Sequence, residues 1–235
     1  MSPRRSRLKL IVPCVVALFG SAFLLVPPAS AVGSTVFYET SWSAPPGSWA
    51  DDRVYGNWLA RYNGYGTTEV VLVNGNRQLR MSPLASTRSS ETHAGLVTTR
   101  PAFGDLDLTV KMRTVRQLRQ SNPNPWEAAW LLWDYQDDEH FYSVVLKPNG
   151  WELGKEDPAY PGAQRYLRTG SSPRFPIGPS YRVRVRQVGA TIKVWVDGQL
   201  LTTFTDRQRP YRSGAVGLYT EDATVLFDQV RVRLP

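Results

Sequence analysis

The stretch from Asn122 to Tyr160 combines aromatic, acidic and basic side chains more densely than any other part of the sequence. It contains four of the eight tryptophans and one of the two histidines. Indole and phenol rings present an apolar body with a polar edge, which suits a hydrated, sugar-like ligand. The stretch is therefore a candidate glycan-binding segment, although the same rings suit a hydrophobic core equally well.

Several titratable residues in this stretch have the chemistry to cleave a glycan. A glycosidase needs two carboxyl groups about 5–10 Å apart, which divide the acid role from the base or nucleophile role. The candidate catalytic residues are Glu127, Asp134, His140 and Glu152, and Glu156 is a further carboxylate of the right type. The sequence leaves the separations open, and ordinary polarity of half-exposed strands is the alternative.

Aromatic and cationic residues supply a matching set of candidate substrate ligands. The set consists of Trp126, Trp130, Tyr142, Lys147, Lys155, Arg116 and Arg119. A polysaccharide lyase would use related chemistry, because it needs a tyrosine, histidine or lysine base and a cation that neutralises a uronate. The basic loops around His140 and Tyr142 therefore make a lyase the second hypothesis.

The elements that must position these residues are β-strands. Period-two alternation runs from Leu106 to Arg113 and from Tyr181 to Arg186, and Asp197-Gly198 suits a two-residue hairpin turn. About a dozen strands are expected, which is too many for one flat sheet, so two packed antiparallel sheets are the economical solution. Two long connections, 115–125 and 156–179, are expected at the rim of the site.

The N-terminal segment predicts export. A basic segment that ends at Lys9 precedes an apolar run from Leu10 to about Leu25, and Ala29-Ser30-Ala31 offers the small residues that signal peptidase reads. The apolar run is shorter than the ~20 residues that span a bilayer. We expect residues 1–31 to be a secretory signal and residues 32–235 to form one extracellular domain.

The content of charged residues, cysteine and histidine limits the classes of partner and cofactor that the sequence predicts. Removal of the signal leaves 24 lysines and arginines against 20 acidic residues, which is weak support for a nucleic acid or an anionic membrane as partner. The single cysteine, Cys14, lies in the signal, so disulfides cannot stabilise the exported domain. Two histidines and no mature cysteine disfavour zinc catalysis. We expect a monomer that binds neither nucleic acid nor membrane.

Three segments resemble the concanavalin A-like lectin/glucanase superfamily, a jelly-roll sandwich. Residues 37–45 (FYETSWSAP) resemble its first strand, residues 130–155 resemble its aromatic hairpin, and the C-terminal strands keep Gly214 and Gly217 in place. The resemblance implies an all-β, two-sheet antiparallel jelly roll across the exported chain. It also favours Trp133 as a core residue, with Trp130 and Asp134 directed towards the ligand.

One departure from the superfamily excludes its commonest enzymatic option. Family-16 glycoside hydrolases carry two glutamates around an aspartate on one strand, spaced E-x-D-x-x-E or E-x-D-x-x-x-E. Asp134, Asp137, Asp138 and Glu139 do not fit that spacing. The fold also hosts lectins, lyases and non-catalytic modules, so it does not decide the activity.

A structural calcium ion is the expected cofactor. Asp228 shares the parity of apolar residues such as Val230 and Val232 in the last strand. A carboxylate on an apolar face is costly unless it is paired or bound to a metal. The resemblance implies a calcium ion between the first and last strands, and the matching residues are Glu39 and Asp228, since calcium prefers oxygen ligands. Pairing of Asp228 with an arginine is the alternative.

These inferences predict a secreted protein that binds a polysaccharide or cell-wall glycan in a concave, aromatic-lined groove. Hydrolysis of that glycan is one version of the prediction. A lyase for an acidic glycan is the second hypothesis. A non-catalytic cell-surface or adhesion domain, in which every tryptophan is core, is the third.

Overall fold

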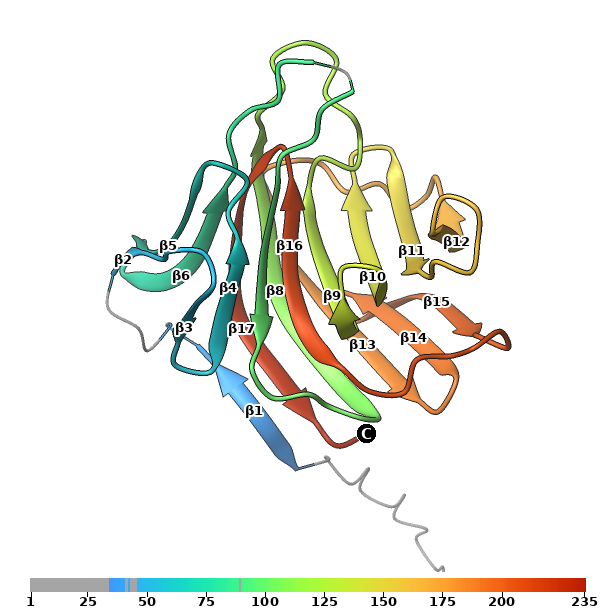
Figure 1. The fold of residues 1–235 in the computed structure, drawn as a ribbon. Helices are drawn as coiled ribbons and strands as arrows, with labels where there is room; N and C mark the ends of the chain where they lie inside the picture. The colour runs from blue at the N-terminus through green and yellow to red at the C-terminus, as the bar shows by residue number, and fades with distance from the viewer. Residues whose placement is uncertain (1–33, 41, 43–45, 89) are drawn as a thin grey trace, which may run out of the picture. The chain divides into compact units, whose positions relative to one another are not determined.

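The computed structural model describes residues 34–235 except 41, 43–45 and 89. The predicted signal, residues 1–31, lies outside the described part. Seventeen β-strands and no helix occur in the described residues, so none of these residues forms a helix that could cross a membrane. The strands form two antiparallel sheets, which confirms the predicted jelly-roll sandwich (Figure 1).

The first sheet has nine strands, with β17 and β8 at its centre. In spatial order its strands are β15 (Gln199–Thr205), β14 (Thr191–Val196), β13 (Tyr181–Val188), β8 (Leu106–Gln117), β17 (Ala223–Arg233), β6 (Asn76–Ser82), β5 (Thr67–Val73) and β2 (Gly47–Ser48). The remaining strand, β1 (Thr35–Glu39), pairs with the C-terminal end of β17.

The second sheet has eight strands, with β9 and β16 at its centre. In spatial order they are β12 (Gln164–Gly170), β11 (Gly150–Glu156), β10 (His140–Lys147), β9 (Ala129–Asp137), β16 (Ala215–Glu221), β7 (Ala94–Thr99), β4 (Trp58–Tyr62) and β3 (Arg53–Tyr55). Three strands of this sheet, β9, β10 and β11, come from the aromatic stretch identified in the sequence.

Local sequence explains the connections. Asp197 and Gly198 have φ angles of 50° and 85°, which confirms the predicted two-residue turn between β14 and β15. The predicted connection 156–179 is interrupted by β12, which the sequence did not indicate. Two loops, 83–93 and 118–128, extend together beyond the strand ends, at the top of Figure 1.

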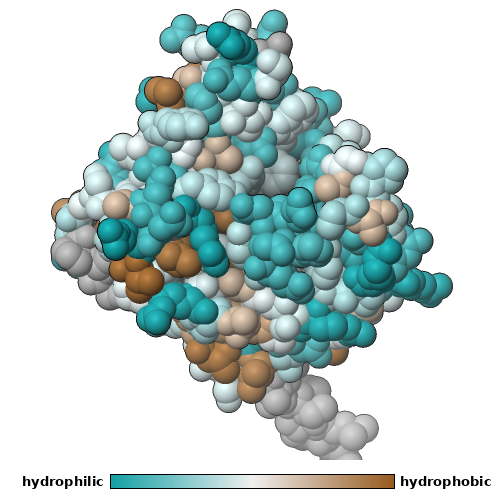
Figure 2. All heavy atoms as spheres, in the orientation of Figure 1, coloured by the Kyte–Doolittle hydropathy of each residue, from teal (hydrophilic) through white to brown (hydrophobic). Residues whose placement is uncertain are grey.

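The inner core fills the space between the two sheets. Trp133 is fully buried there, stacks on Tyr142 with ring centroids 5.7 Å apart, and donates its Nε1–H to Gln187 of the opposite sheet at 2.7 Å. The prediction that Trp133 is a core residue is confirmed. Figure 2 shows hydrophilic residues over most of the visible surface and hydrophobic residues in small separate groups, as expected when the large apolar side chains are internal.

A bulge at Asp134 interrupts the alternation of β9. Asp134 has a φ of 50°, and the register with β16 shifts between Ala215 and Gly217. Gly214 lies so close that a Cβ there would be 2.2 Å from the carbonyl carbon of Asp134, so this position requires glycine. Asp134 consequently follows Trp133 into the interior. The prediction that Asp134 faces the ligand is wrong, because parity does not continue through a bulge.

The interior raises the pKa of Asp134 from 3.8 to about 7. Burial is the main cause; the hydrogen bond from Gln187 Nε2 to Oδ2, 2.7 Å long, partly offsets it, and the charge of Asp105 adds to it. Within the described part of the chain, Oδ1 has no hydrogen-bond partner. Between pH 4 and 7 the folded protein therefore keeps a proton that the unfolded chain has lost.

The free energy of unfolding is expected to fall as the pH rises from about 4 to about 7. The change corresponds to at most about 4 kcal/mol. Asp134→Asn cannot ionise, so it should lose this decline and be more stable than wild type at pH 8. Urea denaturation at pH 4.5 and pH 8 measures the effect, with exposed Asp51→Asn as the control. A stability difference between Asp134→Asn and wild type that is the same at both pH values would contradict the account.

Candidate functional site

The eight-stranded sheet carries a second apolar cluster on its outer face. Along β9, Leu131 and Trp133 join the inner core, whereas Trp130 and Leu132 point the opposite way. The outer cluster consists of Leu96, Ala128, Trp130, Leu132, Tyr135, Val145 and Ala215, with Tyr62, Phe141 and Tyr219 packed against it. We call this surface the aromatic face. The outer side of an antiparallel sheet is usually polar, so an aromatic one indicates a partner or ligand.

Cross-strand register arranges the aromatic face in rows that run across the strands. Trp130 lies between Val145 of β10 and Tyr219 of β16, and the same row continues to Leu96 and Tyr62. The rings of Trp130 and Tyr219 meet edge to face with centroids 5.7 Å apart. Rows perpendicular to the strands could support a chain-like ligand laid across the sheet.

The neighbouring row is lined by small residues. Leu132 lies between Ser143 and Gly217, and Ser143 pairs with Gly154. A Cβ on Gly217 would lie 2.9 Å from Leu132 Cβ, and one on Gly154 would lie 2.9 Å from Ser143 Oγ. Glycine at these two positions therefore keeps the row shallow between the larger side chains of the adjacent rows.

A cavity of about 160 Å³ opens on the aromatic face. It is lined by Tyr62, Leu96, Trp130, Leu132, Tyr135, Asp138, Phe141, Glu156, Gln164, Tyr219 and Glu221. Three of these residues are acidic and none is basic. The cavity thus combines aromatic rings with carboxylate and amide groups, the composition of a ligand site in which a few polar groups fix orientation.

Two of the carboxyl groups in the cavity resist ionisation. Burial raises the pKa of Glu156, and the negative charge of Glu221 raises it further. Burial also raises the pKa of Glu221, although the hydroxyl of Tyr219 donates a hydrogen bond to its Oε1 at 2.8 Å. Desolvated carboxyls that interact with each other have the properties of a general acid.

Hydroxyl groups hold the third carboxylate. Tyr135 donates to Asp138 Oδ1 at 2.8 Å, and Tyr62 donates to the same oxygen at 3.4 Å. Lys147 and Glu152, on the same outer face, form an ion pair with each other. Glu152 pairs with Val145 in the register, so it continues the row that contains Trp130.

Arg119 joins the two loops at the top of Figure 1, which contain Glu91 and Glu127, to the end of β16. Arg119 donates to Glu127 at 2.7 Å and to Asp222 at 3.1 Å, and also donates to the carbonyl oxygens of Arg88 and Glu91. All these groups are part of one ionic network next to Glu221. The charges of Asp222 and Glu127 contribute to the raised pKa of Glu221. The network fixes the loops and the strand end that carries this carboxyl.

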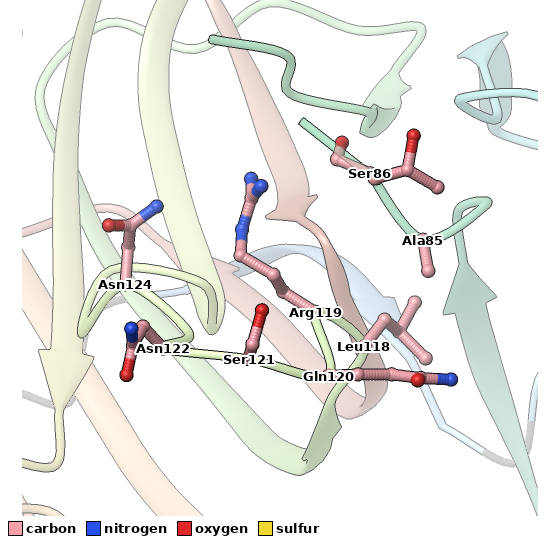
Figure 3. Close-up of a pocket in the computed structure, with 9 residues that line it drawn as sticks. Ala85, Ser86, Leu118, Arg119, Gln120, Ser121, Asn122 and Asn124 are labelled. Atoms are coloured by element: carbon pink, nitrogen blue, oxygen red, sulfur yellow. The ribbon is translucent and has the colours of Figure 1, made fainter. Parts of the chain in front are cut away.

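A second cavity, of about 490 Å³, lies between these loops. Figure 3 shows that two segments, 85–87 and 118–124, supply its lining. Most of the lining is hydroxyl, amide and backbone. Its one charged side chain, Arg119, is already neutralised by the carboxylates described above. The aromatic face is therefore the stronger candidate site.

Some residues predicted from the sequence lie on or near the aromatic face. Trp130, Glu152 and Lys147 lie on it, and Trp126, 40% exposed, lies in the adjacent loop, where its carbonyl accepts the Nε1–H of Trp130 at 2.8 Å. Their predicted roles stay predictions.

Two predicted substrate ligands are instead buried between the sheets. Tyr142 is 0% exposed and donates to Asp206 at 2.7 Å. Lys155 is also 0% exposed, donates to Asp206 at 2.9 Å and binds the carbonyl oxygens of Gln208 and Arg209. Burial opposes ionisation of Asp206, but the hydrogen bonds from Lys155 and Tyr142 outweigh it and lower its pKa. Both side chains hold the 206–211 loop and neither reaches the aromatic face, so nothing in their placement supports the predicted role as substrate ligands.

Four other predicted residues are placed away from the cavity. Glu127 is 1% exposed and is paired with Arg119, so neither side chain is free for a substrate. Arg116 lies on β8 of the other sheet and donates to Thr224. His140 begins β10 and contacts Asp137 at 2.7 Å. The structure therefore separates the residues that a lyase would need.

The sequence reasoning missed Tyr62, Tyr219 and Glu221. The signal for two of them was present, since Gly217, Tyr219 and Glu221 share one parity along β16. Asp138 was considered for the family-16 spacing, and its contacts with two tyrosine hydroxyls depend on the fold.

The premise of the calcium prediction fails, although the ion itself stays a prediction. A bulge at Gln229, with a φ of 51°, puts Asp228 on the outer side of β17 and Val230 on the inner side. Asp228 accepts the Nδ2–H of Asn76 at 2.7 Å and the backbone N–H of Gln229 at 2.8 Å. Glu39 accepts the Nε1–H of Trp58.

The described residues contain no group of three histidine, cysteine, aspartate or glutamate side chains suited to a metal.

Comparison with known proteins identifies the family. Residues 46–233 match the 3-keto-alpha-glucoside-1,2-lyase-like domain. The chain belongs to this family. No curated protein matches the sequence.

Among solved structures, similarity extends to carbohydrate-active proteins. The carbohydrate-binding module CBM66 from Bacillus subtilis is 15% identical, with 74% of this chain and 93% of that chain covered and a TM-score of 0.53. The Bacillus licheniformis beta-glucanase is 15% identical, with 86% and 99% covered and a TM-score of 0.55. The GlcNAcα1-4Gal-releasing endo-β-galactosidase from Clostridium perfringens is 10% identical, with 88% and 64% covered and a TM-score of 0.55.

These likenesses confirm the jelly-roll fold, and the family match together with them confirms the predicted concanavalin A-like superfamily. Together with the family, they make this chain a jelly-roll domain related to glycosidases and carbohydrate-binding modules.

A calcium ion bound by Asp228 would make the melting temperature sensitive to chelator. EDTA should then lower the midpoint by roughly 2–4 °C for each 1 kcal/mol of binding energy removed. Asp228→Ala should abolish this response, and Asp51→Ala, at an exposed site, should keep it. Identical melting curves with and without EDTA would eliminate the ion.

Proposed function

We propose that the aromatic face binds a glycan chain that is neutral or carries amino groups. The observation that carries this proposal is the outer cluster itself, which lines one cavity with aromatic rings and desolvated carboxyls on a sheet face that solvent would otherwise make polar. Membership of a carbohydrate-related family supports the same conclusion.

The charge of the cavity selects the class of glycan. Asp138, Glu156 and Glu221 line it and no basic residue does, while the nearby Lys147 is neutralised by Glu152. A uronate polymer would meet carboxyl groups and no cation in the lining itself, which costs affinity; the guanidinium of Arg61, 5.6 Å from the centre of the Tyr135 ring, is the basic group beside it. This disfavours a polysaccharide lyase that acts on an acidic glycan. An amino sugar would find carboxylate partners, and a neutral sugar would find hydrogen-bond acceptors.

Hydrolysis is the second candidate function, and the Glu156–Glu221 pair favours it. Both carboxyls have a raised pKa, and the charge of Glu221 acts on Glu156. A carboxyl that keeps its proton can protonate the leaving oxygen of a glycosidic bond, while a second carboxylate acts as base or nucleophile. In this assignment Glu221, the more buried of the two, is the acid.

Removal of an aromatic contact should weaken glycan binding by a few-fold to about tenfold, the size expected for one ring contact of ~0.5–1.5 kcal/mol. Tyr166, 60% exposed on β12 next to Gly154, is a suitable target because its loss should not disturb the core. Isothermal titration with neutral, amino-sugar and uronate polysaccharides measures the effect of Tyr166→Ala and Trp130→Phe.

The matched control is Tyr38→Ala, since Tyr38 is 49% exposed on β1 of the other sheet. Equal loss of affinity for the neutral and amino-sugar polymers in Tyr38→Ala and Tyr166→Ala, or uronate binding that Tyr166→Ala weakens and Tyr38→Ala does not, would contradict the proposed site.

The same panel distinguishes binding from cleavage. If the domain hydrolyses its glycan, new reducing ends should appear with wild type and disappear with Glu221→Gln, while affinity is kept. Reducing ends that persist in Glu221→Gln and Glu156→Gln would exclude this acid pair. Binding without reducing ends from wild type would make the domain a binding module.

We also propose that the protein is secreted and carries residues 32–235 as its mature chain. The basic segment, apolar run and small residues of the first 31 positions support this. Expression in a secreting bacterial host should release protein with Val32 at its N-terminus, as read by intact-mass measurement. Full-length protein retained by the cells would contradict the proposal.

A further inference from the structure

The outer face of the nine-stranded sheet carries many basic side chains, whereas acidic side chains line the cavity of the aromatic face. Its outward side chains on β8, β13, β14 and β17 include Lys111, Arg182, Arg184, Arg186, Lys193, Arg231 and Arg233. We call this surface the basic face. Two carboxylates share this face. Asp107 forms a bidentate ion pair with Arg184, and Asp228 is buried.

Strand register sets the basic side chains in a regular lattice. Arg184 lies between Thr109 of β8 and Trp195 of β14, and Arg231 lies on the other side of Thr109. Adjacent strands are about 4.8 Å apart, and alternate residues of one strand are about 6.7 Å apart. Cations spaced in this way repel one another, so an anionic polymer laid over them would relieve the repulsion along its length.

A hollow of about 310 Å³ lies in the middle of the basic face. Four arginines line it, Arg182, Arg184, Arg231 and Arg233, against one carboxylate, that of Asp107. In the described part of the chain, Arg184 is the only one of the four in an ion pair, and the buried Nε–H of Arg233 has no hydrogen-bond acceptor. The hollow thus carries an excess of positive charge.

The aromatic rings on this face are already covered. The guanidinium of Arg231 lies 4.5 Å from the centre of the Tyr38 ring, and that of Arg184 lies 4.8 Å from the Trp195 ring. A single-stranded nucleic acid needs open ring faces on which its bases can stack. The covered rings therefore favour a polymer that is recognised through its anionic groups and hydroxyls alone.

We propose that the basic face binds an anionic polysaccharide through Arg182, Arg231 and Arg233, independently of the glycan on the aromatic face. Planar guanidiniums match the two oxygens of a carboxylate or sulfate group. Thr109, Gln229 and the Tyr38 hydroxyl line the same hollow and provide hydrogen-bonding groups for sugar hydroxyls. One sheet would then bind a neutral or amino-sugar glycan, and the other sheet would bind an anionic polysaccharide.

The test uses the mature protein and two defined polymers, polygalacturonate for carboxylate and dextran sulfate for sulfate, with neutral dextran as blank. Affinity is measured by biolayer interferometry at several salt concentrations. The triple variant Arg182→Gln, Arg231→Gln, Arg233→Gln should weaken binding to at least one polyanion by about tenfold and reduce its salt dependence. The better-bound polymer identifies the anionic group.

The matched control removes the same charge elsewhere. Arg53→Gln, Arg100→Gln, Arg174→Gln changes three exposed arginines that form no ion pair in the described structure. It should change the affinity less than twofold. Equal weakening in both triple variants, or no binding of either polyanion by wild type, would overturn the proposal. Tighter binding of poly(dT) or phosphatidylglycerol vesicles, dependent on the three face arginines, would overturn the assignment to a polysaccharide.

Discussion

The architecture depends on a strand that is apolar on both of its faces. β9 directs Leu131 and Trp133 into the inner core and Trp130 and Leu132 to the outside. The opposite sheet covers the first pair. Among the described residues no second sheet covers the other pair; neighbouring strands instead contribute Tyr62, Tyr219 and other rings that close over it and leave a cavity. The candidate site is thus a consequence of how this one strand is buried.

Buried polar contacts fix the elements around that strand. Gln187 links Trp133 and Asp134 of β9 to the opposite sheet, Lys155 and Tyr142 meet on Asp206, and Arg119 joins two loops to the end of β16. Each contact orders a segment next to the aromatic face without touching its cavity. Residues that have the right chemistry for catalysis in the sequence therefore serve packing, while the desolvated carboxyls at the cavity are Glu156 and Glu221.

Sequence reasoning reached the fold because its signals are local. Alternation, the Asp197-Gly198 turn and the three superfamily-like segments depend on near neighbours, and they gave the two-sheet sandwich, the core position of Trp133 and the outward position of Trp130. Parity failed where a bulge shifted it, at Asp134 and near Asp228. A bulge is set by contacts such as the close approach of Gly214 to Asp134, from a strand far away in the chain.

Most of the candidate site could not be predicted from local sequence signals, because its residues meet only through contacts between distant strands. Tyr62 lies on β4, far in the sequence from Tyr219 and Glu221 on β16, and these strands meet with β9 only through the order β9-β16-β7-β4. Opposite charge on the two outer sheet faces also appears only after folding, since the composition shows no more than a small basic excess.

The central claim, that the aromatic face binds a glycan, is tested most directly by the tryptophan indole N–H signals in an NMR titration with an amino-sugar oligosaccharide. Three tryptophans report on three regions of the protein. Trp130 lies on the aromatic face, Trp133 in the inner core and Trp195 on the basic face. The account predicts that the Trp130 signal shifts with ligand while those of Trp133 and Trp195 stay in place. A shift of Trp195 with an unchanged Trp130 would contradict it.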